Sequence, residues 1–191
     1  MKIALYLGSF NPFHNGHLEV VKTALNDFKM DGVIIVPTMQ NPWKEEKVLD
    51  IDKRIKIIKQ SLLVSKKDIS IPGLYQFYYP NGIGVSSIEK DLIPPYYSYA
   101  TLHALKNKYC NDEIFVLVDS DTMKDIPNWM HGGKIIEDYD FLIVDRPRNS
   151  ISSSSIREML RTRNKMDAYY SDEKLARYVS PEVIELLKKY Y

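Results

Sequence analysis

Two histidines near the beginning of the chain, His14 and His17, stand three residues apart in the stretch GSFNPFHNGH. At the start of a helix this spacing turns both imidazole rings toward one side. The first turn of a helix also presents backbone N–H groups and the positive end of the helix dipole, and both favour an anion. We therefore expect backbone N–H groups available to a ligand, together with two imidazole donors, around a bound phosphate.

The residues before the histidines are typical of a turn that a ligand can approach closely. Gly8 allows close approach of the backbone, and Asn11 followed by Pro12 favours a turn. The stretch matches neither the P-loop pattern nor GxGxxG, so those two phosphate-binding loops do not apply. Spacing alone leaves two alternatives open, an ordinary turn with incidental histidines and a pair of metal ligands. The chain has only four histidines, and no Cys, Asp or Glu cluster accompanies this pair.

A second polar stretch, ISSSSIREMLR at 151–161, places four serines before an apolar pattern of helical period. Serines in this position are typical N-cap residues, and Arg157 follows one turn into the expected helix. The stretch predicts a second anion site, formed by Ser154 and Arg157 at a helix start. The alternative is a flexible, low-complexity linker.

Strands and helices alternate along the chain and would position both stretches. Apolar runs of strand length occupy 2–7, 33–38, 113–119 and 140–147, and short strands are expected within 68–71 and 83–91. Helical spacing occupies 16–28, 50–64, 98–109 and, after a loop entry, 128–139, and a capped terminal helix covers 180–191. The first strand, helix and strand form a βαβ unit, which requires a right-handed crossover in a parallel sheet.

This alternation predicts an α/β fold. We expect a doubly wound, Rossmann-like, mostly parallel sheet with helices on both faces and a small C-terminal helical part. Such sheets bind ligands outside the carboxyl ends of their strands. The stretch GSFNPFHNGH follows the first strand directly, so it lies where a ligand would sit.

Composition limits the class of protein. The 191 residues suit a single domain over 1–191, and a net charge of +1 does not favour general binding to nucleic acid or to membranes. Cys110 is the only cysteine, which excludes a disulfide within the chain and fits a reducing compartment. No apolar run approaches the ~20 residues of a membrane span. We therefore expect a cytoplasmic protein.

The stretch GSFNPFHNGH resembles the HxGH signature of the nucleotidyltransferase superfamily, G-[ST]-F-[DN]-P-x-H-x-G-H, and ISSSSIR resembles its second signature, ISSTxIR. Three further stretches, VPTMQNPWK, SYATLHAL and residues 115–147, resemble the bacterial nicotinate-nucleotide adenylyltransferases. The resemblance implies adenylyl transfer from ATP to nicotinate mononucleotide, which gives nicotinate adenine dinucleotide and pyrophosphate in NAD biosynthesis. The alternatives are nicotinamide mononucleotide or another phosphate acceptor, and a non-catalytic nucleotide-binding protein.

The resemblance also implies roles for particular residues, with His14 and His17 as the catalytic pair. The implied ATP-binding residues are Gly8, Ser9, Phe10, His14, His17, Lys44, Asp121, Ser154 and Arg157. The implied nicotinate-nucleotide-binding residues are Thr101, Trp129 and Arg146, with Trp129 stacked on the pyridine ring. Mg²⁺ would be carried by the ATP phosphates. The expected partners are the small-molecule substrates ATP and nicotinate mononucleotide. Binding to nucleic acid or to membranes is not expected, and a homo-oligomer is compatible with the resemblance.

The chain departs from the pattern of the family at two positions and in one segment. Asp119 stands where the family usually has glycine, and His103 stands where it has aspartate. The aromatic stretch 74–80 has no counterpart in the family, and a packed hairpin, a lid and an oligomer contact are its candidate roles.

Overall fold

The computed structural model describes residues 1–39, 48–64, 82–145, 151–162 and 168–191. Five parallel strands form one sheet in the order β3-β2-β1-β4-β5. The strands are β1 (Lys2–Gly8), β2 (Gly32–Pro37), β3 (Ile83–Val85), β4 (Glu113–Asp119) and β5 (Asp140–Val144). The chain leaves β1 toward one edge of the sheet and later returns to its other side, which is the doubly wound topology.

The central strand is apolar on both of its faces. Ile3 and Leu5 belong to one buried cluster, and Ala4 and Tyr6 belong to the other, because successive side chains of a strand point to opposite faces. A parallel sheet must be covered on both sides, so its strands are continuous apolar runs rather than alternating ones. This explains why the run KIALYL gives a central strand.

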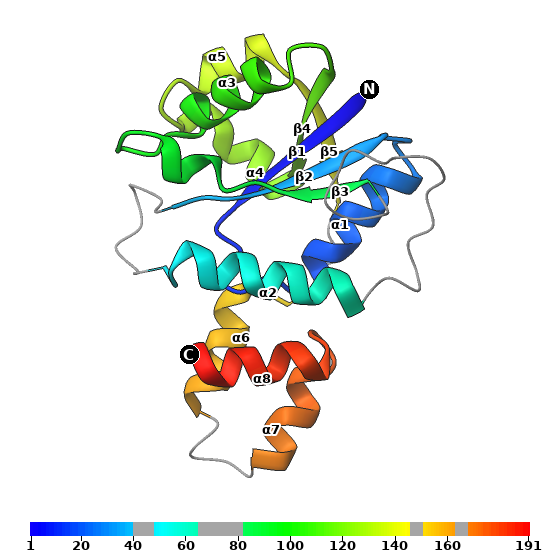
Figure 1. Ribbon diagram of the computed structural model, residues 1–191, viewed down its shortest axis with the longest axis vertical. Helices are drawn as coiled ribbons and strands as arrows, with labels where there is room; N and C mark the ends of the chain where they lie inside the picture. The colour runs from blue at the N-terminus through cyan, green and yellow to red at the C-terminus, as the bar shows by residue number, and fades with distance from the viewer. Residues whose placement is uncertain (40–47, 65–81, 146–150, 163–167) are drawn as a thin grey trace.

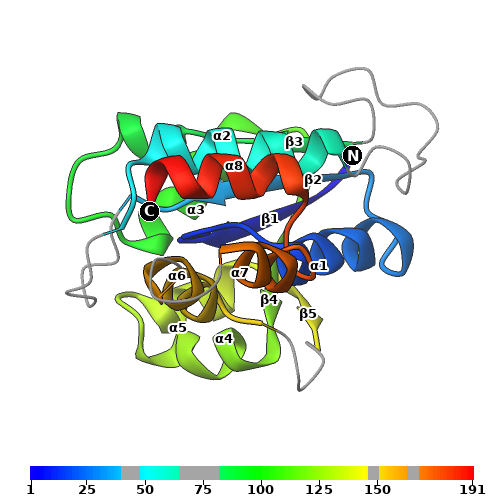
Figure 2. The same cartoon turned by 90° about the horizontal axis from the view of Figure 1, so that it is seen from below.

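Helices cover both faces of the sheet (Figure 1). On one face lie α1 (Asn15–Asn26) and α2 (Ile51–Val64), and on the other lie α3 (Ser98–Lys108), α4 (Ser120–Asp125) and α5 (Gly132–Asp138). The C-terminal helices are α6 (Ser153–Thr162), α7 (Ala168–Leu175) and α8 (Pro181–Tyr190). Figure 2 shows α8 running along α2, and the two helices are in contact. The predicted fold class, including the C-terminal helical part, is confirmed.

Several element boundaries differ from the prediction. The region expected as one helix over 128–139 contains the shorter α5, preceded by α4 and the 3₁₀ turn η3 (Ile126–Asn128). The strand expected within 83–91 ends at Val85 and is followed by the 3₁₀ turn η2 (Ile88–Asp91). Glu89 of η2 is completely buried and bonded, so this turn is held by a polar contact that periodicity does not encode. The strand expected at 68–71 and the aromatic stretch 74–80 lie outside the described residues.

No helix in the described ranges is both long enough and apolar enough to cross a membrane.

Two neighbouring glycines at the start of α5 differ sharply in the space around them. A Cβ on Gly132 would lie 2.0 Å from the carbonyl oxygen of Ile126, whereas a Cβ on Gly133 would meet nothing within 4 Å. We expect Gly132→Ala to destabilise the fold by about 3 kcal/mol, because the clash is with backbone. We expect the control Gly133→Ala to be neutral or to stabilise by up to about 1 kcal/mol through helix propensity. Urea unfolding measures both, and equal effects would contradict the packing of α5 on η3.

Candidate active site

A cavity of about 440 Å³ opens at the carboxyl ends of β1 and β4. These strands are neighbours in the sheet, and the chain winds away from them in opposite directions, so the cavity lies at the topological switch point. Gly8 at the end of β1 and Asp119 at the end of β4 both contribute to its wall. The expected position of the ligand site, directly after the first strand, is therefore where the structure places a cavity.

Most of the residues predicted for the site meet around this cavity. The predicted residues that line it are Gly8, Ser9, Phe10, His17, Trp129, Ser154 and Arg157. Two others, Lys44 and Arg146, lie outside the described residues. Three others, His14, Thr101 and Asp121, do not line the cavity. A different physical reason places each of them outside its wall.

The two histidines form a reciprocal cap at the start of α1. His14 is the N-cap, and its Nδ1 accepts a hydrogen bond from the backbone N–H of Gly16 at 3.1 Å. The Nδ1 of His17 accepts from the backbone N–H of His14 at 3.2 Å. Because Nδ1 is an acceptor in both rings, each neutral imidazole carries its proton on Nε2. His17 can therefore donate that proton to an oxygen in the cavity, while His14, only 2% exposed, lies behind it with the ring centroids 3.9 Å apart.

The prediction that backbone N–H groups at the start of α1 are available to a ligand is wrong. The N–H of Asn15 donates to the carbonyl oxygen of Tyr178 at 2.9 Å, and that of Gly16 donates to His14. The N–H of His17 donates to the carbonyl oxygen of His14 at 2.9 Å. The capping histidine and the segment before α8 satisfy these donors, so the imidazole and the helix dipole remain as the features of this helix start that favour an anion.

Aromatic rings hold the orientation of His17. Its ring lies 5.0 Å from that of Phe10 in an edge-on arrangement and 5.3 Å from that of Phe13 in a stacked one. Phe10 adopts a φ of 44°, a left-handed conformation that is uncommon outside glycine. A Cβ on Gly8 would come within 2.9 Å of the Phe10 ring, so this glycine is required for the ring to lie against β1. Strained backbone of this kind is characteristic of functional loops.

The second polar stretch closes the cavity from the start of α6. The backbone N–H of Ser155 donates to Ser152 Oγ at 3.1 Å, which confirms the predicted serine cap. Arg157 is 8% exposed, and its two terminal nitrogens donate to the carbonyl oxygen of Asn11 at 2.6 Å and to Ser154 Oγ at 3.1 Å. Ser153 Oγ also donates to the carbonyl oxygen of Pro12 at 2.9 Å. The two signatures, far apart in sequence, therefore form one wall of the cavity.

Asp121, predicted to bind ATP, lies outside the cavity wall, and Asp119 contributes to the wall at this point. The side chain of Asp121 is 94% exposed and pairs with Lys124 at 3.2 Å. Asp119 lines the cavity, and its Oδ1 accepts from the N–H of Thr122 at 2.7 Å as the N-cap of α4. Since α4 begins at Ser120, Asp119 lies at the mouth of the cavity and Asp121 falls on the outer side of a short helix.

Thr101, predicted to bind the nicotinate nucleotide, also lies outside the cavity wall. It is completely buried in α3, and its hydroxyl donates to Oε1 of Glu89 at 2.7 Å. Its hydroxyl is therefore used inside the protein. His103, the second departure from the family pattern, is exposed on the same helix and stacks with Tyr99 outside the cavity.

Sequence reasoning missed several lining residues and one buried cation. Tyr96 and Tyr97 line the cavity without belonging to a predicted motif, and Thr38 and Asp125 line it from stretches in which they were not singled out. Arg54 is 1% exposed in α2. A signal for it exists in the sequence, because Arg54 falls three residues after Ile51 and four before Ile58, on the apolar side of the helix.

An open parallel sheet with a cavity at its switch point defines a Rossmann-like α/β protein, and the imidazole and the guanidinium that line this cavity are groups that favour an anion. The sequence model of the cytidylyltransferase-like family matches residues 5–159. The chain therefore belongs to the cytidylyltransferase-like family of nucleotidyltransferase enzymes.

Similar proteins carry consistent names. A protein of Cytophaga hutchinsonii called "probable nicotinate-nucleotide adenylyltransferase" is 29% identical, with 100% of this chain and 98% of that protein covered. A protein of Fusobacterium nucleatum with the same name is 31% identical over 76% of this chain and 68% of its own length. The solved Plasmodium falciparum nicotinic acid mononucleotide adenylyltransferase, complexed with NaAD, superposes with a TM-score of 0.70 at 18% identity. That alignment covers 99% of this chain and 95% of the other, so the two proteins share their fold.

Proposed function

We propose that this chain transfers the adenylyl group of ATP to nicotinate mononucleotide, giving nicotinate adenine dinucleotide and pyrophosphate in NAD biosynthesis. The relatives named for this reaction support the proposal. One observation carries it: His17 from the start of α1 and the Ser154–Arg157 pair from the start of α6 line the same cavity. Hydrogen-bond donors from the starts of two helices that meet at one cavity suit a chain of phosphates.

The proposed reaction is a direct displacement at phosphorus. A phosphate oxygen of the mononucleotide attacks the α-phosphorus of ATP, and the bond from that phosphorus to the bridging oxygen of the β-phosphate breaks. Both electrons of that bond leave with pyrophosphate. No covalent enzyme intermediate is needed, so catalysis consists of positioning and of stabilising negative charge on phosphate oxygens.

The proposed roles belong to residues that line the cavity and to His14, which contacts one of them. His17 donates its Nε2 proton in a hydrogen bond to an oxygen of the α-phosphate. His14 is a positioning residue, because its backbone N–H holds Nδ1 of His17 and fixes the tautomer. Ser154 and Arg157 hold the β- and γ-phosphates, and Gly8, Ser9 and Phe10 line the adenosine pocket. The half-buried Trp129 offers its indole face to the pyridine ring.

Magnesium fits this cavity as an ion brought in by the nucleotide. Mg²⁺ prefers oxygen ligands and is usually held by one or two carboxylates together with substrate phosphates. Asp119 and Asp125 both line the cavity and supply carboxylates of this kind. In the described part of the chain no three His, Cys, Asp or Glu side chains form a cluster that could hold a metal. When bound, Mg²⁺ would neutralise charge on the phosphates of ATP.

The test is pyrophosphate release from ATP with nicotinate mononucleotide and nicotinamide mononucleotide compared side by side. We expect release that requires Mg²⁺ and an acceptor, with a higher kcat/KM for the nicotinate form. A higher kcat/KM for the nicotinamide form would support the same adenylyl transfer but with nicotinamide mononucleotide as the acceptor. If ATP binds but neither acceptor releases pyrophosphate, the proposed function is wrong.

A further inference from the structure

Arg54, a buried cation of α2, lies outside the cavity but is bonded to two of the loops that form it. Its side chain is 1% exposed. Nη1 donates to the carbonyl oxygens of Ser9 and Thr38, each at 2.7 Å, and Nη2 donates to that of Met39 at 3.2 Å. Nε donates to the carbonyl oxygen of Leu49 at 2.5 Å. All four hydrogen bonds are accepted by main-chain carbonyl oxygens, so Arg54 constrains the positions of these backbone segments.

Three of the four bonded carbonyl groups, those of Ser9, Thr38 and Met39, belong to segments at the carboxyl ends of adjacent strands. Ser9 follows β1 and Thr38 follows β2, and both residues line the catalytic cavity. The N–H of Thr38 also donates to the carbonyl oxygen of Gly8 at 3.0 Å. A single guanidinium nitrogen therefore joins the two loops just beyond the point where sheet pairing ends.

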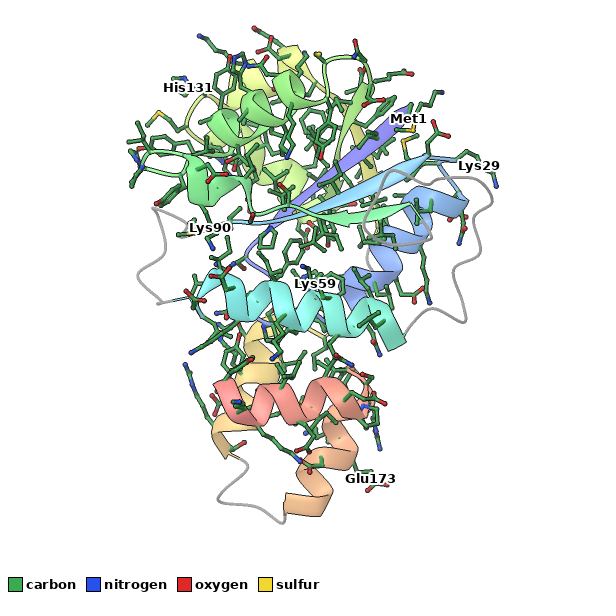
Figure 3. The ribbon with its side chains drawn as sticks, viewed as in Figure 1. Met1, Lys29, Lys59, Lys90, His131 and Glu173 are labelled. Atoms are coloured by element: carbon green, nitrogen blue, oxygen red, sulfur yellow. The ribbon has the colours of Figure 1, made fainter. Side chains whose placement is uncertain are left out.

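Glu89 of η2 bonds the residue Met39, which Arg54 also bonds, but at its backbone N–H rather than at its carbonyl oxygen. Its Oε2 accepts from the backbone N–H of Met39 at 2.5 Å, while the carbonyl oxygen of Met39 accepts from Arg54. Thr101 bonds the second oxygen of Glu89. Burial raises the pKa of Glu89 and lowers the pKa of Arg54, so each charge depends on these polar contacts. Lys90, labelled in Figure 3, pairs with Asp52 of α2 at 2.9 Å and joins η2 to the same helix.

A buried cation is costly unless its hydrogen bonds are satisfied, and apolar residues of similar volume often stabilise a core equally well. Stability alone therefore does not require an arginine here. The planar fork of five donors does something that a hydrophobic side chain cannot, because it sets the separation of several carbonyl groups at once.

We propose that Arg54 is a positioning residue for nucleotide binding, which holds the loops after β1 and β2 at the separation needed to receive ATP. The inference rests on the proposed use of ATP and extends it to a side chain that does not line the cavity. Small errors in the position of binding groups weaken ligand binding and catalysis strongly. Loosening the hydrogen bonds of Arg54 is therefore expected to weaken the binding of ATP.

The test measures the Kd of ATP by calorimetry for Arg54→Lys and Arg54→Gln, with Lys59→Met as the control. Lys59, labelled in Figure 3, is an exposed cation of the same helix. Lysine keeps the charge and loses the fork, and glutamine removes the buried charge and keeps one amide. We expect the folded variants to bind ATP about tenfold more weakly than the control. Circular dichroism at the assay temperature establishes that they are folded.

A purely structural role predicts a lower melting temperature with an unchanged Kd. A Kd within about twofold of the control in a folded variant therefore overturns the proposal. Failure of both variants to fold also overturns it, because Arg54 would then be required for the fold itself. Binding is measured without an acceptor, so the result is independent of whether nicotinate mononucleotide is the substrate.

Discussion

Replacing His17 with alanine is expected to lower kcat by about 10²–10³, the cost of losing one oxyanion donor. The expected effect on ATP affinity is small, because the proposed Nε2 contact is strongest when charge develops on the α-phosphate. Steady-state kinetics of pyrophosphate release, together with ATP binding by calorimetry, separates the two effects. An increase in KM with an unchanged kcat would refute a role in the transition state.

The same substitution also removes half of the cap at the start of α1, so the prediction needs a control for stability. His17→Gln supplies an acceptor for the backbone N–H of His14, as glutamine does at the third position of other capping boxes. We expect this variant to recover the melting temperature without recovering kcat. Recovery of both would assign His17 to the cap alone. His103→Ala, on the exposed face of α3, is expected to leave kcat unchanged.

Arg157→Lys is expected to lower kcat/KM for ATP by about 10–100-fold, the range for losing one hydrogen bond from a charged group. The ammonium of lysine cannot reproduce the forked contact in which two nitrogens reach Asn11 and Ser154. Most of the loss is expected in the KM for ATP, because the proposed role is to hold the β- and γ-phosphates throughout the reaction. Initial rates at varied ATP and saturating acceptor give this number.

Arg161→Lys is the matched control for Arg157→Lys. Arg161 is exposed one turn further along α6 and does not line the cavity at the ends of β1 and β4. We expect its kinetic constants to remain within about twofold of the unmodified protein, as for an ordinary surface substitution. Equal losses in the two variants would show a general effect of basic charge on α6 and would contradict the forked contact.

The cavity wall shows where prediction from sequence reaches its limit. Gly8, His17 and Arg157 could be predicted, because each belongs to a stretch whose composition is unusual over several consecutive residues. Asp119 and Asp121 are two positions apart, and the choice between them depends on where α4 begins. Such a boundary is decided by packing. The end of a strand or the start of a short helix can shift by one or two residues with little change in local energy.

Arg54 and Thr101 illustrate a second limit. Each lies on the inner side of a helix, where a polar residue finds its partners in segments distant in sequence, namely the loops after β1 and β2 and the turn η2. Hydrophobic periodicity predicts which side of a helix is buried and carries no information about which carbonyl or carboxylate will face it.

By itself, the sequence determined the alternation of strands and helices, the parallel sheet and the two polar stretches at the end of β1 and at the start of α6. These features are local, because periodicity, turn residues and caps act over a few positions. The tertiary structure alone decided that the two stretches share one cavity, that the N–H of Asn15 at the start of α1 is already bonded to Tyr178, and that Arg54 holds the neighbouring loops together. Each of these depends on contacts between residues far apart in the chain, whose geometry is set only when the helices pack on the sheet.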